Sequence, residues 1–185
     1  MKCSEICALI EQEYGTEYAC DWDNVGLLAG RSTKEVKKIL LSLDATDEVV
    51  RMAAEGGYDM LITHHPMLFS AIKRVTDQDM NGRRLLELIR NDISYYAMHT
   101  NYDVLGMADL SADYLKLENC QILDVTGENE SGEPEGIGRV GEIPSVSDND
   151  EQRNEISLAD YCEEVKKAFA LDTVKVFGNL KQKVH

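Results

Sequence analysis

Three of the four histidines in this chain lie at the ends of two short apolar segments. His64 and His65 follow the apolar residues 60–63, and His99 opens the run His-Thr-Asn-Tyr-Asp, which ends at Asp103. Neutral imidazoles together with a carboxylate are a ligand set that proteins use for Zn, Mn, Fe, Co or Ni. The pattern therefore predicts a site for divalent metal ions whose identity the residues leave open.

The adjacency of His64 and His65 raises a geometric question. Neighbouring side chains in a regular strand face opposite sides, so the two imidazoles share one site only where the strand breaks up. Pro66 favours such a break. Otherwise each imidazole faces a different ion, or the pair is only a polar strand end, but the second cluster around His99 favours the metal site.

Asp103 is the expected carboxylate ligand, although Asn-Tyr-Asp after a strand is also ordinary turn chemistry. Three roles remain open for His99. His99 could be a metal ligand, a residue that orients a ligand from outside the coordination sphere, or a hydrogen-bonded strand histidine without a role in metal binding. In a hydrolytic reaction, His99 would be the catalytic candidate for moving a proton.

The segments around these residues alternate in type along the chain. Apolar runs predict strands at 38–44, 59–63 and 93–98, and helical spacing predicts helices at 46–57 and 81–91. This order indicates an α/β fold with a mixed or mostly parallel sheet that is flanked by helices. Ligands of such sheets bind beyond the carboxyl ends of the strands, which is where the histidines fall.

We expect two parts, an α/β metal-site domain over residues 1–126 and a remainder over residues 127–185. The second half of the chain carries weaker signals. They predict, in order, a helix at 109–117, a strand at 121–125, a loop at 126–136, a strand at 137–143, a polar loop at 144–156, a helix capped by Ser157, a strand at 173–177 and the start of another strand at 181–185.

Composition narrows the function classes. The net charge is −15, from 34 acidic against 19 basic residues, which makes nucleic acid an unlikely partner. No apolar run reaches the roughly 20 residues of a membrane span, and residues 1–5 lack a signal-peptide pattern. The five cysteines are scattered without a Cys-x-x-Cys pair, which is typical of reduced thiols, so we expect a cytoplasmic protein without membrane contact.

Several blocks of this chain resemble the NIF-three-like family of dinuclear-metal proteins, which are also known as GTP cyclohydrolase I type-2-like proteins. The similarity holds in order and spacing to about residue 178. The matching blocks are Trp22–Gly30 (WDNVGLLAG), Ile39–Thr46 (ILLSLDAT), Ile62–Phe69 (ITHHPMLF), His99–Asp103 (HTNYD) and, more weakly, Gly136–Gly141 (GIGRVG).

The resemblance implies that His64, His65 and Asp103 are metal ligands and that the protein forms a homo-oligomer, a hexameric ring. It also implies that the loop Trp22-Asp23-Asn24 lies near the site. An exposed loop of this composition could contact substrate through Trp22 and its polar neighbour Asn24. From the residues alone, the same loop could equally be a buried tryptophan that anchors a turn. The Gly136–Gly141 segment is either a close-approach loop or a plain β-turn.

Members of the family usually continue into a second α/β half that supplies a further histidine and glutamate to the two-ion centre. This chain ends before them, and residues 104–185 contain no His-x-x-x-Glu. We therefore expect a truncated member whose second half is incomplete, with fewer than two metal ions per chain.

Two hypotheses for function follow. The first is a metal-dependent hydrolase of a nucleotide or other small molecule. The resemblance implies hydrolysis of a purine ring, as by a cyclohydrolase, and the same centre would also serve hydrolysis of a phosphate ester. The alternative is a non-catalytic metal-binding protein with a regulatory or assembly role. A plain α/β domain with structural histidines is the third interpretation.

Overall fold

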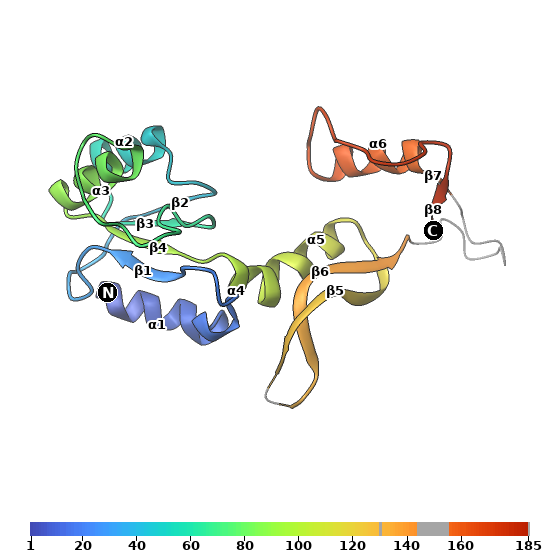
Figure 1. The fold of residues 1–185 in the computed structure, drawn as a ribbon, viewed down its shortest axis with the longest axis horizontal. Helices are drawn as coiled ribbons and strands as arrows, with labels where there is room; N and C mark the ends of the chain where they lie inside the picture. The colour runs from blue at the N-terminus through green and yellow to red at the C-terminus, as the bar shows by residue number, and fades with distance from the viewer. Residues whose placement is uncertain (130, 144–155, 185) are drawn as a thin grey trace. The chain divides into compact units, whose positions relative to one another are not determined.

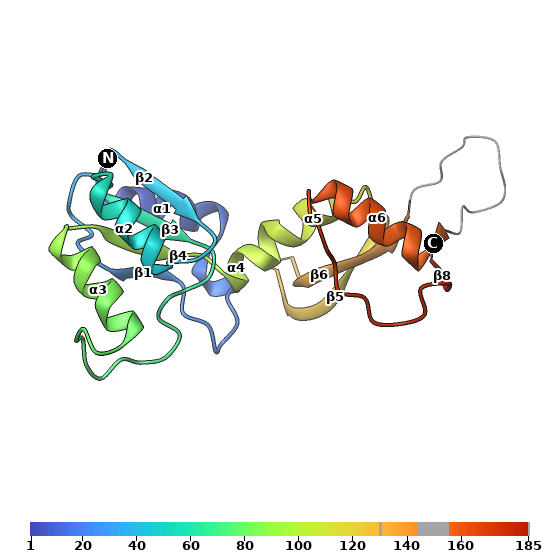
Figure 2. The same ribbon diagram turned by 90° about the horizontal axis from the view of Figure 1, so that it is seen from above.

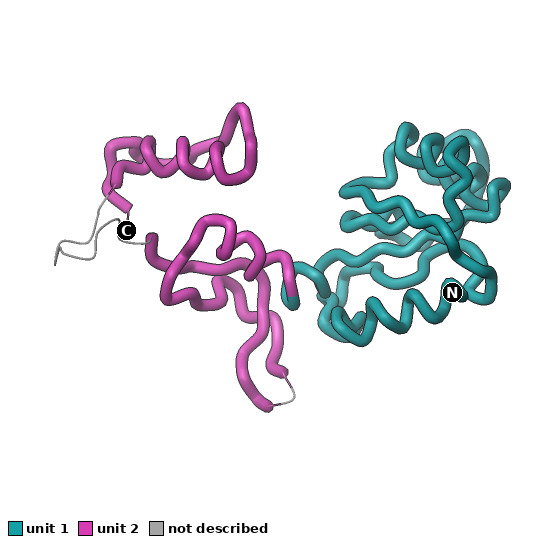
Figure 3. Tube along the Cα trace, turned by 180° about the vertical axis from the view of Figure 1, so that it is seen from behind, with its two compact units in different colours: residues 1–105 teal, residues 106–185 magenta. Residues whose placement is uncertain are grey.

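The structure is a computed structural model that describes residues 1–129, 131–143 and 156–184. It divides into two compact units, Met1–Leu105 and Gly106–His185 (Figure 3). Residue 126, where the sequence predicts a boundary, lies within a strand (Glu118–Glu128) that pairs with the next strand in one hairpin. The predicted division into domains by function stays a prediction.

A four-stranded sheet forms the centre of the first unit, in the order β1-β4-β3-β2. Its strands are β1 (Gly26–Ala29), β4 (Ser94–Ala97), β3 (Met60–Thr63) and β2 (Ile39–Ser42). β2, β3 and β4 are parallel, and β1 is antiparallel to β4, so the sheet is mixed. This confirms the predicted fold class, although β1, a short segment that begins with glycine, was not predicted as a strand.

Helices cover both faces of this sheet (Figures 1 and 2). α1 (Cys3–Glu13) lies on one face, and α2 (Asp47–Glu55) and α3 (Met80–Arg90) lie on the other. Thr46 is the N-cap of α2, and its hydroxyl accepts a hydrogen bond from the backbone N–H of Val49 at 3.2 Å. This is the cap that the sequence predicts.

Strand alternation divides the core into two clusters. Leu61 and Tyr95 pack with residues of α2 and α3, whereas Met60, Ile62 and Tyr96 pack with residues of α1. All five are buried. Both faces of β3 and β4 are therefore packed, and these two strands carry the polar segments that follow them on a rigid base.

The hydroxyl of Tyr95 connects the core to the segment after β3. It lies 2.8 Å from the hydroxyl of Thr63 and accepts a hydrogen bond from the backbone N–H of Met67 at 2.7 Å. Tyr95 itself is fully buried. Because an unpaired buried N–H is costly, this hydroxyl fixes where the chain runs after the histidine pair.

The second unit combines a long hairpin with a helical segment. Its hairpin pairs β5 (Glu118–Glu128) with β6 (Pro134–Glu142), and a two-stranded pairing joins β7 (Ile156–Ser157) to β8 (Lys183–Val184). Its helices are α5 (Ala108–Tyr114) and α6 (Leu158–Ala168). Ser157 caps α6, as predicted, by accepting a hydrogen bond from the backbone N–H of Asp160 at 3.1 Å.

Three predictions for this unit need correction or qualification. The loop expected at 126–136 is shorter, because β5 and β6 extend the pairing to Glu128 and Pro134. The Gly136–Gly141 segment lies within β6, where a Cβ on Gly136 would come within 2.0 Å of the carbonyl oxygen of Asp124. The strand expected at 173–177 is wrong, since that segment pairs with no described strand.

The polar loop predicted at 144–156 falls almost entirely on residues 144–155, which lie outside the described residues. Across the described parts of the chain, none of the helices has the length and apolar character that crossing a membrane requires.

Replacing Tyr95 by phenylalanine tests its role in holding the segment after β3. The change leaves the Met67 N–H without its buried acceptor, so we expect the free energy of unfolding to fall by about 1–3 kcal/mol. Tyr96→Phe is the matched control, because the Tyr96 hydroxyl makes only a 3.4 Å contact with Glu11. Urea unfolding of both variants measures the difference, and equal losses would contradict the role given to Tyr95.

Candidate metal centre

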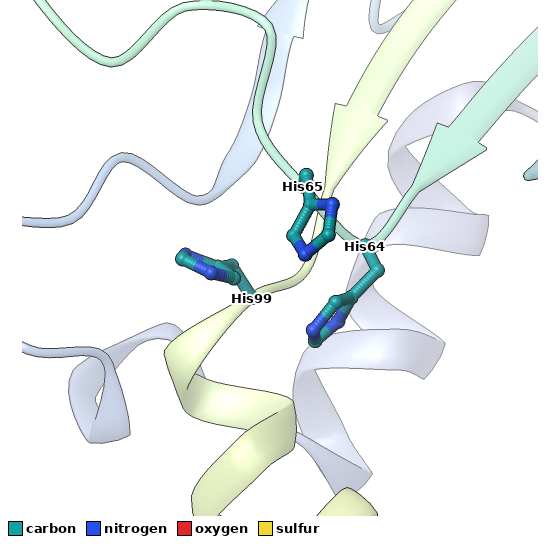
Figure 4. A group of neighbouring side chains, drawn as sticks. All are labelled: His64, His65 and His99. Carbon is teal, nitrogen blue, oxygen red and sulfur yellow. The ribbon is translucent and has the colours of Figure 1, made fainter. Parts of the chain in front are cut away.

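Three histidines converge at the carboxyl ends of two neighbouring strands (Figure 4). His64 and His65 follow β3, and His99 follows β4, which pairs with β3 in parallel register. One ring nitrogen from each imidazole lies within 4.8 Å of the others. The ring centroids are 5.0 to 5.6 Å apart. The sheet thus brings together residues that are distant in sequence, as its predicted topology requires.

His64 and His65 face the same site because the strand ends immediately before them. β3 stops at Thr63, whose hydroxyl donates a hydrogen bond to the carbonyl oxygen of His65 at 2.8 Å. The two rings are tilted by 50° rather than pointing to opposite sides. The two imidazoles therefore lie in one group of histidines instead of facing opposite sides of the sheet.

Carboxylates hold two of the three imidazoles from outside the cluster. Nδ1 of His65 lies 2.8 Å from the Asp44 carboxylate, and Nδ1 of His99 lies 3.1 Å from both oxygens of Asp23. An ionised carboxylate only accepts hydrogen bonds, so it favours the tautomer with the proton on Nδ1. Nε2 of each ring is then left with a free lone pair, which is the form that binds a metal ion.

The Asp23 side chain is fully buried. Burial acts to raise the pKa of Asp23, but hydrogen bonds from Thr100 and His99 outweigh it and hold the pKa below its ordinary value. The Thr100 hydroxyl donates at 2.5 Å and the Thr100 backbone N–H at 3.0 Å. Asp23 is therefore a buried anion that is compensated on several sides, and it keeps His99 in one orientation.

His64 differs from the other two imidazoles. Its Nδ1 is buried and has no hydrogen-bond partner among the residues that the structure describes, and its Nε2 lies 3.5 Å from a carboxylate oxygen of Asp103. Burial lowers the pKa of His64, and although Asp103 opposes this, the neighbouring His65 and His99 add to the lowering. Burial and the two neighbouring imidazoles thus favour the neutral ring, which is the form that binds a metal ion, and its Nε2 is the nitrogen that faces Asp103.

Asp103 reaches the cluster through His64. It begins η2 (Asp103–Met107), a π-helical segment that follows the short helix α4 (Thr100–Tyr102). Segments of this kind frequently occur at functional sites. Asp103 lies beside the site as expected, but the group within 4.8 Å consists of histidines, so its place among the ligands stays a prediction.

The two predicted substrate contacts have different surroundings. Trp22 is 61% exposed, so it is not the buried anchor of a turn. Its ring lies edge-on to His99 with centroids 6.1 Å apart. The Asn24 side chain instead donates a hydrogen bond to the carbonyl oxygen of Leu68 at 2.5 Å, which ties its loop to the segment after β3.

Reasoning from the sequence places Asp23 near the site only through the family resemblance, and it gives neither Asp23 nor Asp44 the role of an imidazole partner. Asp44 lies two residues beyond the end of β2, so the strand-end rule that selects the histidines could also have selected Asp44. The pairing of Asp23 with His99 carries no such signal, because only the folded chain brings together two residues that are 76 positions apart.

Comparison with known proteins assigns the family. A sequence model of the Duf34/NIF3 (NGG1p interacting factor 3) family matches residues 1–185. Among curated proteins, a "GTP cyclohydrolase 1 type 2 homolog" of Clostridium acetobutylicum is 30% identical to this chain over 187 aligned residues, and the alignment covers 100% of this chain. The protein of the same description from Clostridium perfringens is 32% identical to this chain, and the alignment covers 98% of this chain. The chain spans 66% of the length of each of these two relatives.

A solved structure agrees with the fold. The Bacillus cereus protein related to NIF3 superposes with a TM-score of 0.85 at 22% sequence identity, covering 99% of this chain and 74% of that one. At this identity the likeness supports the fold alone. The match of the family model along the whole chain decides the assignment: the chain belongs to the Duf34/NIF3 family.

Proposed function

We propose that this chain binds a divalent metal ion through His64, His65 and Asp103 and hydrolyses a nucleotide or a related small molecule there. The observation that carries the proposal is the convergence of three imidazoles, two of them held by carboxylates. The description of the clostridial relatives as "GTP cyclohydrolase 1 type 2 homolog" supports the substrate class.

A divalent ion in this site would supply the Lewis acidity that hydrolysis needs at neutral pH. The protein's own contribution is orientation. Asp44 fixes the ring of His65, and the segment that carries both His64 and His65 is held by the buried Tyr95 hydroxyl. The lone pairs are thus set in place before any ligand arrives, which lowers the cost of binding.

His99 is proposed as the residue that moves a proton. Asp23 holds the proton on Nδ1 of His99, so Nε2 accepts a proton from the attacking water and then returns it to the leaving group. The buried Asp23 carboxylate stabilises the imidazolium that forms between these two transfers. This assigns His99 a role distinct from that of His65, although both rings lie in one cluster.

Metal analysis separates these two roles. Protein loaded with Mn or Zn and then desalted is expected to hold fewer than two ions per chain, because the described ligand atoms form one cluster. His65→Ala should lower metal affinity more than the roughly 10- to 100-fold that the loss of an outer partner costs. His99→Ala should keep the metal and lower kcat by about 10²- to 10⁴-fold.

The measurements are metal content by mass spectrometry and turnover of GTP and a generic phosphodiester. Two tight ions per chain would contradict the first expectation, and loss of metal in His99→Ala would make His99 a ligand. Turnover without metal would refute the hydrolase. Metal binding without turnover of any substrate would favour the alternative, a non-catalytic metal-binding protein with a regulatory or assembly role.

Asp23→Asn tests the orientation of His99. An amide can donate to Nδ1 as well as accept from it, so the fixed tautomer is lost while the side-chain shape is kept. We expect kcat to fall by at least about tenfold with metal content unchanged. Asp44→Asn is the matched variant and should instead weaken metal binding, by roughly 10- to 100-fold. If both variants changed kcat and metal affinity to the same extent, the two carboxylates would not serve separate roles in proton transfer and metal binding.

We also propose that the chain forms a homo-oligomer, a hexamer by its resemblance to the family. The hairpin of the second unit supports this, because it leaves the apolar side chains of Leu123, Val125 and Val140 exposed. Such residues are typical of surfaces that another protein covers. Sedimentation velocity should show a species larger than a monomer, and Leu123→Glu should shift it towards monomer. A strict monomer at micromolar concentration would refute the ring.

A further inference from the structure

Two exposed aromatic side chains stand beside the histidine cluster. The rings of Trp22 and Phe69 are nearly parallel, with centroids 6.0 Å apart and planes at 12°. Phe69 also lies edge-on to His99, at 5.7 Å between centroids. Phe69 is 48% exposed, and Trp22 is more exposed still. The pair therefore leaves aromatic surface open to solvent directly beside the proposed proton-transfer residue.

The surrounding contacts keep this pair in place. Asp23, next to Trp22 in the chain, is buried and bonded to Thr100. Asn24 donates to the carbonyl oxygen of Leu68, the residue before Phe69, and so ties the two aromatic segments together. Leaving large aromatic rings in water forgoes the hydrophobic stabilisation of burial. Because the two exposed rings are nonetheless held side by side, a ligand that binds them would not have to order them first.

We propose that Trp22 and Phe69 form a stacking platform for a planar heteroaromatic ring of the substrate. The inference rests on the proposed hydrolysis, whose substrate class it narrows to molecules that carry such a ring. Aromatic side chains bind nucleobase-like rings face to face, and the gain does not depend on which base is present. Asn24 is then a positioning residue that holds the Phe69 segment, rather than a substrate contact.

The single tryptophan of the chain makes the platform directly observable, because all indole emission comes from Trp22. The probes are adenosine 5′-monophosphate and ribose 5-phosphate, which share sugar and phosphate and differ in the ring. Binding is followed by emission after excitation at about 295 nm, corrected for nucleotide absorbance, in the metal-free and in the Zn-loaded chain of residues 1–185. Thermal unfolding confirms that each variant is folded.

Adenosine 5′-monophosphate should quench the emission saturably, with ribose 5-phosphate binding at least roughly tenfold more weakly. Phe69→Leu should weaken the nucleotide by roughly tenfold, and Phe69→Tyr should restore it. Phe177→Leu is the matched control, since Phe177 is a 93% exposed phenylalanine in the other unit, and it should change nothing.

Equal binding of the two probes would overturn the platform, as would unchanged nucleotide affinity in Phe69→Leu. A Phe69→Leu variant that changes the sedimentation coefficient instead of nucleotide affinity would also overturn it, because the pair would then serve contacts between copies of the chain. Nucleotide binding without turnover would refute the hydrolysis and leave the platform standing. Metal-dependent turnover of a ring-free phosphodiester with the same kcat/KM as a nucleotide would refute the platform and leave the hydrolysis standing.

Discussion

The buried carboxylate of Asp23 is the interaction on which the arrangement of the site depends. A charge without solvent is tolerated only where hydrogen bonds replace water, and Thr100 and His99 provide them. The Thr100 hydroxyl also accepts a hydrogen bond from the backbone N–H of Cys20 at 2.9 Å. The same group of bonds thus orients an imidazole, begins the helical segment that leads to Asp103, and places the loop that carries Trp22.

A second link joins the site to the core. The hydroxyl of Tyr95 lies within the packed layer beneath α2 and α3, yet its partners belong to the segment that carries His64 and His65. The segment that carries His64 and His65 is therefore held in place only when the sheet that contains Tyr95 is folded. An ion that binds only the folded chain would stabilise it by RT ln(1 + [L]/Kd), about 2.7 kcal/mol at a hundredfold excess over Kd.

Local patterns explain why much of the first unit was predictable. Apolar runs mark β2, β3 and β4, and the strand-end rule places His64, His65 and His99 together. The bond from Asp23 to His99 and the stacking of Phe69 on Trp22 were not predictable, because they are contacts between distant segments. In the second unit, residues 173–177 show that an alternating pattern alone makes no strand without a partner to pair with.

The parallel pairing of β3 with β4 has a consequence for how such sequences vary in length. Inserting or deleting one residue within either strand would reverse which side chains face α1 and would shift the histidines out of register. Segment 66–79, between β3 and α3, has no regular structure to disturb. Insertions and deletions among relatives should therefore accumulate in its distal part, beyond Phe69, and spare the two short strands that deliver the imidazoles.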